Sequence, residues 1–155
     1  MELSIAASFT AAAISLITLV VTTYFTGRRE RVKWAREALA EAFYDFVNTS
    51  YAASQALHHH QKQLWAGADG SSLQASADEV NAQVLALRHA QTKIRLLAPA
   101  RTVDLANEVR FRIKDAVQAA SPTITVEQHE QNRAIIAEAR ARLLDSAKKD
   151  MALPR

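Results

Sequence analysis

The stretch LSIAASFTAAAISLITLVVTTYFTG, from Leu3 to Gly27, contains no charged side chain. A helix needs about 20 mostly apolar residues to cross the ~30 Å hydrocarbon core of a bilayer, and this run is long enough to do so. A cleaved signal peptide would begin with basic residues and have a shorter apolar core, whereas the only charged side chain before this run is that of Glu2. We therefore expect an uncleaved transmembrane anchor over residues 1–27.

The residues that flank this run predict its direction in the membrane. Basic residues stay on the cytoplasmic side, and they crowd the C-terminal flank of the run. The chain is thus expected to be a single-pass protein of the cell (inner or plasma) membrane, with its N-terminus outside and its C-terminal domain cytoplasmic. Aromatic side chains favour the membrane interface. The residues expected to meet the lipid bilayer there are Tyr24, Phe25, Arg28, Arg29, Arg31 and Lys33.

Small residues recur along one face of the predicted anchor at spacings of three and four, namely Ser4, Ser8, Ala11, Ser15, Thr18 and Thr22. Such a face lets two membrane helices approach closely, and hydroxyl groups can form hydrogen bonds across the contact. The alternative is that these hydroxyls bond to carbonyl groups of their own helix. The first interpretation predicts a homo-oligomer, or association with a membrane protein partner.

The rest of the chain has the composition of an all-helical domain. Ala accounts for 31 of the 155 residues, whereas Gly and Pro number only 3 each, and Ala is the best helix former while Gly and Pro are the worst. Apolar residues recur every three or four positions, which predicts helices over residues 28–65, 72–98 (or 76–98), 102–120 and 125–150. Short links imply an antiparallel bundle over residues 28–150, followed by a frayed tail at 151–155. Continuity between the anchor and the long first bundle helix, through Gly27, stays open.

The same periodicity predicts which side chains form the core. The inward positions expected in the first helix are Val32, Ala35, Leu39, Ala42, Phe46, Ser50, Ala53, Leu57, His60 and Leu64, and the apolar face is widened by Phe43, Val47 and Tyr51. Those in the later helices are Leu73, Ala77, Val80, Val84, Leu87, Ile94, Ala106, Val109, Ile113, Val117, Ile136, Ala139, Leu143 and Ala147, with Leu85 and Leu97 alongside. Capping-box spacings at Ser76–Glu79 and Thr125–Gln128 predict helix starts. Seams rich in Ala bury little area, so oligomerisation is a reasonable way to complete the core.

Three adjacent histidines, His58, His59 and His60, are the most visible candidates for a metal site. Neighbouring side chains on a helix point about 100° apart, so the three cannot bind one ion, and helical zinc pairs use a spacing of four residues. In an antiparallel hairpin His60 would face the region of Asp78 and Glu79, which leaves a weak possibility of a shared site. We expect a solvated polar patch instead, and structural roles for the lone residues His89 and His129. No metal or other cofactor is predicted.

Other charged clusters carry no catalytic motif. Glu37, Glu41 and Asp45 share one helix face, but the Glu-x-x-His pattern of di-iron bundles is absent, so pairing with Lys or Arg is expected. Cys is absent, as are phosphate-binding loops and nucleophile triads, and we predict no enzymatic activity. The net charge of +3 is small. The basic residues Arg101, Arg110, Arg112 and Lys114 lack interleaved stacking aromatics, so nucleic acid is not an expected partner. The same cluster could as easily face anionic lipid.

Two segments resemble known proteins: Arg-Arg-Glu-Arg-Val-Lys-Trp-Ala-Arg-Glu at residues 28–37, and Lys-Ile-Arg-Leu-Leu-Ala-Pro-Ala at residues 93–100. With the preceding span, they resemble a set of small, largely uncharacterised actinobacterial single-pass membrane proteins that carry a helical cytoplasmic domain. The resemblance implies topology and no activity. The leading hypothesis is a membrane-anchored interaction or scaffold module that binds a protein partner or self-assembles. The alternative is a membrane-tethered sensor whose bundle binds a small ligand or metal.

Overall fold

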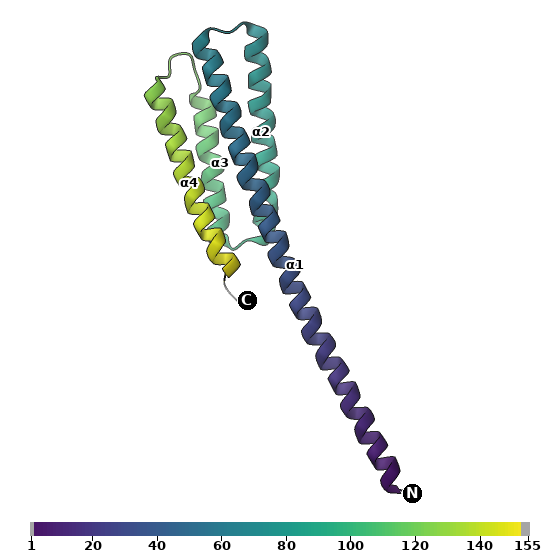
Figure 1. Cartoon of the computed structure of the whole chain (residues 1–155). Coiled ribbons are helices and arrows are strands. Elements are labelled where there is room, and N and C mark those ends of the chain that lie inside the picture. The colour runs from purple at the N-terminus through teal and green to yellow at the C-terminus, as the bar shows by residue number, and fades with distance from the viewer. Residues whose placement is uncertain (1, 153–155) are drawn as a thin grey trace. The chain divides into compact units, whose positions relative to one another are not determined.

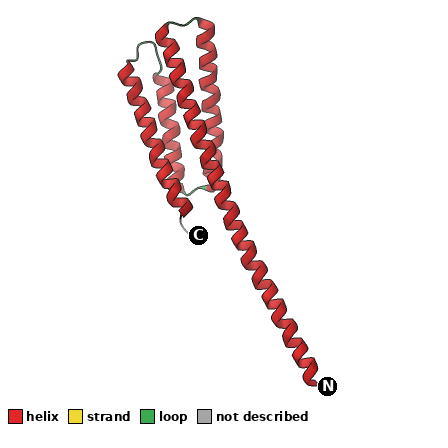
Figure 2. Ribbon diagram, viewed as in Figure 1, coloured by secondary structure: helices red, strands yellow, loops and turns green. Residues whose placement is uncertain are grey.

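The computed structural model describes the backbone of residues 2–152, and the side chains of residue 30 and of residues 33–150. Four helices follow one another along the chain: α1 (Glu2–Ala66), α2 (Gly70–Leu97), α3 (Ala100–Ala119) and α4 (Val126–Ala152) (Figure 1). Between residues 2 and 152 there is no strand, and only short loops interrupt the helices (Figure 2). The prediction of an all-α chain with four helices is confirmed.

Helix α1 joins the predicted anchor to the bundle, because its backbone is helical without a break from Glu2 through Gly27 to Ala66. Contacts within the chain define two units, Met1–Glu37 and Ala38–Pro154. Within the described residues no helix is long and apolar enough to span a bilayer. The run 3–27, with its stripe of small residues and with Tyr24 and Phe25, lies outside the described side chains, as do Arg28, Arg29 and Arg31.

Within the second unit, the four helices form an antiparallel bundle. For three pairs of helices, two contacts at different heights along the bundle show the relative direction. Helix α1 meets α2 through Asp45–Lys93 and His60–Ser76, and α3 meets α4 through Thr102–Ser146 and Glu108–Arg142. Helix α1 meets α4 through Ser50–Arg140 and His58–His129. In each pair, later residues of one helix meet earlier residues of the other. The direction of each pair confirms the predicted antiparallel arrangement.

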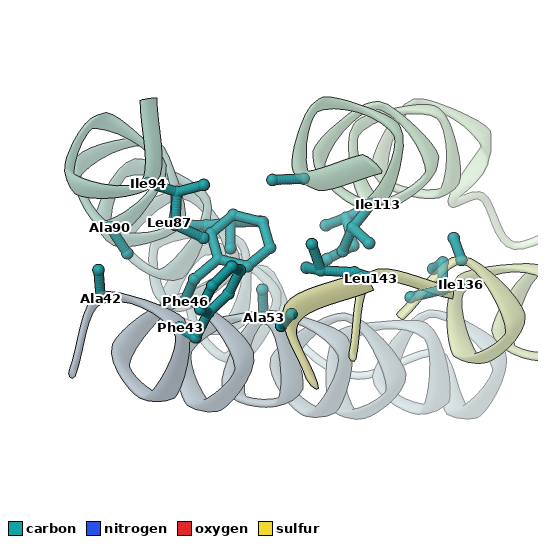
Figure 3. Close-up of a cluster of buried hydrophobic side chains, with 14 of the residues drawn as sticks. Ala42, Phe43, Phe46, Ala53, Leu87, Ala90, Ile94, Ile113, Ile136 and Leu143 are labelled. Carbon is teal, nitrogen blue, oxygen red and sulfur yellow. The ribbon is translucent and has the colours of Figure 1, made fainter. Parts of the chain in front are cut away.

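The core follows the predicted seams closely, and Figure 3 shows part of it around Phe46, Leu87 and Ile113. Predicted inward positions that are buried are Leu39, Ala42, Phe46, Ser50, Ala53, Leu57, Val80, Leu87, Ile94, Ala106, Val109, Ile113, Ile136, Ala139, Leu143 and Ala147. Some predicted positions are wrong or only partly right. Ala35, Tyr51 and Leu85 are exposed, whereas Phe43 is buried. His60 and Leu64 are half-buried, and the neighbouring Gln61 is fully buried instead. Val47, Leu73, Ala77, Val84, Leu97 and Val117 are also half-buried, and Val32 lies outside the described side chains.

Local capping interactions explain where the helices begin and end. Gly67, with φ of 63°, closes α1, while the N–H groups of Gly67 and Ala68 bond to the carbonyls of Leu64 and Gln63, as in a Schellman motif. Helix α2 begins earlier than either predicted start, because Asp69 Oδ1 accepts a hydrogen bond from Ser72 N–H at 2.8 Å. Ser76 is therefore inside the helix, not its cap.

The start of α4 confirms the second predicted capping box. Thr125 N–H donates to Gln128 Oε1 at 3.1 Å, and Gln128 N–H donates to Thr125 Oγ1 at 3.2 Å. This reciprocal pair satisfies two backbone donors that the first turn of a helix otherwise leaves free. The position of His129, four residues after Thr125, is thereby fixed within the first turn of α4.

Candidate functional site

Two histidines that are 71 residues apart in sequence meet between α1 and α4. His58 Nδ1 lies 3.0 Å from His129 Nε2, and the two rings stack with centroids 5.2 Å apart. One nitrogen must donate and the other must accept, so at least one imidazole in this pair is neutral. His129 is buried, and the ring of Trp65 packs edge-on against it at 5.4 Å.

The surroundings of this pair favour neutral imidazoles. Burial lowers the pKa of His58, and the positive charges of Arg133 and Lys62 lower it further. Burial also lowers the pKa of His129, with Glu130 opposing the shift and Arg133 adding to it. A neutral imidazole keeps one nitrogen lone pair available, which is the form that binds a metal ion.

The carboxylate of Glu130 adds a third potential ligand beside the pair. One ligand atom from each of His58, His129 and Glu130 lies within 4.8 Å of the other two. The hydrogen bonds from Arg133 Nη1 to Glu130, at 2.9 and 3.1 Å, lower the pKa of this carboxyl group. Among the described residues this is the one group of three such side chains close enough to share an ion.

The structure separates the three adjacent histidines that the sequence analysis grouped together. The predicted solvated patch is correct for the exposed His59, whose ring bonds to Gln63. It is wrong for His58 and for His60, whose Nδ1 lies 2.7 Å from Ser76 Oγ. The partner of His60 is thus Ser76, not Asp78 or Glu79, and these two carboxylates accept hydrogen bonds from Gln74 Nε2 and Gln83 Nε2.

His129 was predicted to be a lone residue, and this part of the prediction is wrong because its ring contacts that of His58. The sequence carried a usable signal. In an up-down bundle the end of the first helix lies beside the start of the fourth, so a histidine near each of these ends is a candidate pair. The prediction instead placed His60 only against the second helix, across the short turn.

A buried arginine lies further along the same pair of helices. The side chain of Arg140 donates from Nε to Ser50 Oγ at 2.9 Å, and from Nη2 to Ser50 O at 3.1 Å and Ser54 Oγ at 2.8 Å. Its guanidinium carbon lies 3.8 Å from the centre of the Tyr51 ring. Burial lowers the pKa of Arg140. Among the described residues no carboxylate forms an ion pair with it.

A groove of about 340 Å³ runs between α1 and α4 and includes Arg140 in its lining. The residues that line it are Tyr51, Ser54, Gln55, Glu130, Arg133, Ala134, Ile136, Ala137 and Arg140. Glu130 belongs both to this groove and to the group with His58 and His129, so the two features adjoin. The lining combines two arginines and one carboxylate with uncharged polar and apolar side chains.

The other predicted clusters have ordinary structural roles. Asp45 pairs with Lys93, and Glu37 lies 3.8 Å from the exposed Lys33, which confirms the expected pairing of these acids with Lys. Two basic residues of α3 have partners within that helix: Arg112 lies 3.8 Å from Glu108, and Arg110 packs over the ring of Phe111.

Comparison with protein-family models, with curated proteins and with solved structures gave no match to this chain.

Proposed function

We propose that this chain is a membrane-anchored helical module that presents its bundle at the inner face of the cell membrane and there binds a protein partner or self-assembles. The observation that carries the proposal is the uncharged run 3–27, which is followed directly by basic residues and then by the helices of the bundle. The basic flank from Arg28 to Arg36 favours a cytoplasmic bundle.

Membrane fractionation tests the anchor. Replacing Leu16 and Val20 together by Glu puts two charges in the middle of the run, which insertion disfavours by roughly 2.5 kcal/mol or more for each charge. We expect this variant to leave the membrane fraction. The control replaces the exposed Leu96 by Glu, which should leave membrane association unchanged. Full membrane association of the double variant would contradict the anchor.

Reporter fusions test the direction. A phosphatase that is active only outside the cytoplasm, fused to the C-terminus, should be inactive, whereas a fluorescent protein fused there should fluoresce. Active phosphatase at the C-terminus would reverse the proposed topology while leaving the anchor itself in place.

Self-association through the small-residue stripe is the second part of the proposal. Replacing Ala11 and Ser15 together by Leu should weaken a homo-oligomer, because bulky side chains keep the two helices apart. The matched control replaces Phe9 and Leu16 by Ala, away from the stripe, and should weaken it less. Crosslinking in native membranes measures the effect. A monomer at every protein concentration, or equal loss in both variants, would count against self-association.

A ligand sensor is the second candidate function, and the groove at Arg140 favours it. A buried cation without a carboxylate partner attracts an anion, since burial strengthens electrostatic interactions. Inorganic phosphate and acetate are suitable probes, because an anion that binds the folded bundle raises its melting temperature. A rise that Arg133→Gln abolishes would support the sensor, and no rise with either probe at millimolar concentration would argue against it.

A further inference from the structure

We propose that His58, His129 and Glu130 form a binding site for one divalent transition-metal ion of the zinc class, shared between α1 and α4. The proposal concerns a site in the bundle and is independent of the anchor and of self-association. Two imidazoles and one carboxylate are a known donor set for zinc, with a fourth position left for water or a small anion.

The distances between the ligand atoms suit such an ion. Zinc binds His nitrogen at about 2.0–2.1 Å, so two ligands of a tetrahedral site lie roughly 3.3 Å apart. His58 Nδ1 and His129 Nε2 are 3.0 Å apart. A small increase in the distance between these two nitrogens would let both of them bind one ion. The Glu130 oxygen lies within 4.8 Å of both and belongs to an exposed side chain.

The protons on the two imidazole rings can be arranged so that both facing nitrogens bind the metal ion. In the N–H···N bond one of the two facing nitrogens carries a proton, whereas a metal requires a lone pair on both. A neutral imidazole has two nitrogens, so the donor ring moves its proton to its other nitrogen and both rings stay neutral. The Glu130 carboxylate accepts hydrogen bonds from Arg133 Nη1 on both of its oxygens, at 2.9 and 3.1 Å. It can give one oxygen to the metal while the other stays bonded to Arg133.

The donor set also limits which ions fit. Imidazole suits Zn²⁺, Ni²⁺ and Cu²⁺, whereas Mg²⁺ and Ca²⁺ prefer oxygen ligands. A bound ion would join two helices whose ligands are 71 residues apart in sequence. Because the three ligands come together only in the folded bundle, metal binding would favour the folded state.

Trp65 provides a local reporter. The chain has two Trp residues, Trp34 and Trp65, so Trp34→Phe leaves only the ring that lies 5.4 Å from His129. The test uses the full-length, untagged protein with this substitution in mild detergent. Cu²⁺ should quench the fluorescence of Trp65 saturably, and Zn²⁺ should reverse the quenching by competition. Calorimetry should then give one Zn²⁺ per chain, and Mg²⁺ should have no effect.

The neighbouring histidine His59 supplies a matched control. His58→Ala and Glu130→Gln should each weaken Zn²⁺ binding by about tenfold or more, while His59→Ala should leave it unchanged. Both test residues are at least partly exposed, and circular dichroism verifies that each variant is folded. Zn²⁺ should raise the melting temperature of the parent protein and of His59→Ala only. No saturable binding, or equal affinity in all three variants, would overturn the proposal and leave the pair as a hydrogen bond within the core.

Discussion

Arg140 allows a sharp test of how a buried cation is held without a carboxylate. Each hydrogen bond to a charged group contributes about 1.5–3 kcal/mol, and the side chain donates three, to Ser50 Oγ, Ser50 O and Ser54 Oγ. Removing the guanidinium from water costs several kcal/mol and offsets most of that gain. We therefore expect a modest net loss when the side chain is removed, of about 2–3 kcal/mol for Arg140→Ala.

The acceptors of Arg140 explain why the loss should not be larger. Ser50 Oγ also bonds to Val47 O at 2.7 Å, and Ser54 Oγ also bonds to Ser50 O at 2.9 Å. Both hydroxyls therefore keep a partner when Arg140 is replaced, and no buried polar atom of these two side chains is stranded. Arg140→Met retains most of the volume and packs on Tyr51, so it should cost less than about 1.5 kcal/mol.

Thermal unfolding of the full-length protein in detergent, followed by circular dichroism, measures these differences. At this size 1 kcal/mol shifts the melting temperature by roughly 4 °C. The control is Arg142→Met, on the same helix but half-exposed and paired with Glu108, which should cost within about 0.5 kcal/mol. If Arg140→Met were as destabilising as Arg140→Ala, the charge itself would be required and the reasoning would fail.

Two further predictions concern the core and the cap of α2. Phe46 is fully buried, so Phe46→Ala should cost about 3–5 kcal/mol in denaturant unfolding; the half-exposed Phe111 gives the control, since Phe111→Ala should cost much less. Asp69→Ala should lower the melting temperature, whereas Asp69→Ser should lower it much less, because Ser also caps helices well. Hydrogen bonds from Ser71 and Ser72 lower the pKa of Asp69. The stabilisation of the folded state by the Asp69 carboxylate is therefore complete above the usual aspartate pKa, and it is lost as the pH falls through the lowered pKa. Melting temperatures measured across acidic pH would show this loss.

Hydrophobic periodicity predicted the bundle well because the seams are regular. In α4 the predicted positions Ile136, Ala139, Leu143 and Ala147 are all buried, at spacings of three and four that keep one stripe facing the core. The predicted helix ends were less accurate where a stronger capping residue lies near the predicted one. Asp69 starts α2 before Ser76 because three of its hydrogen bonds involve Ser71 and Ser72.

Polar core residues account for most of what the sequence did not reveal. Gln61 is fully buried, but a polar residue is not part of the hydrophobic pattern from which core positions are predicted. In the core, its side-chain Nε2 donates a hydrogen bond to Ser121 O at 2.8 Å. Gln91 is buried beside Asn107 in the same way. Each partner belongs to another segment of the chain, so the pairing of helices had to be known before these side chains could be placed.

The pairing of α1 with α4 shows why these polar contacts matter. Short turns force α1 against α2 and α3 against α4, but no turn joins α1 to α4, and Ala-rich surfaces fit together in several registers. Arg140 with Ser50, and His58 with His129, supply contacts that only one register satisfies. Sliding α4 by one turn would leave a guanidinium buried without acceptors, a penalty of several kcal/mol. The same residues that form the candidate site therefore also select the register in which α4 closes the bundle.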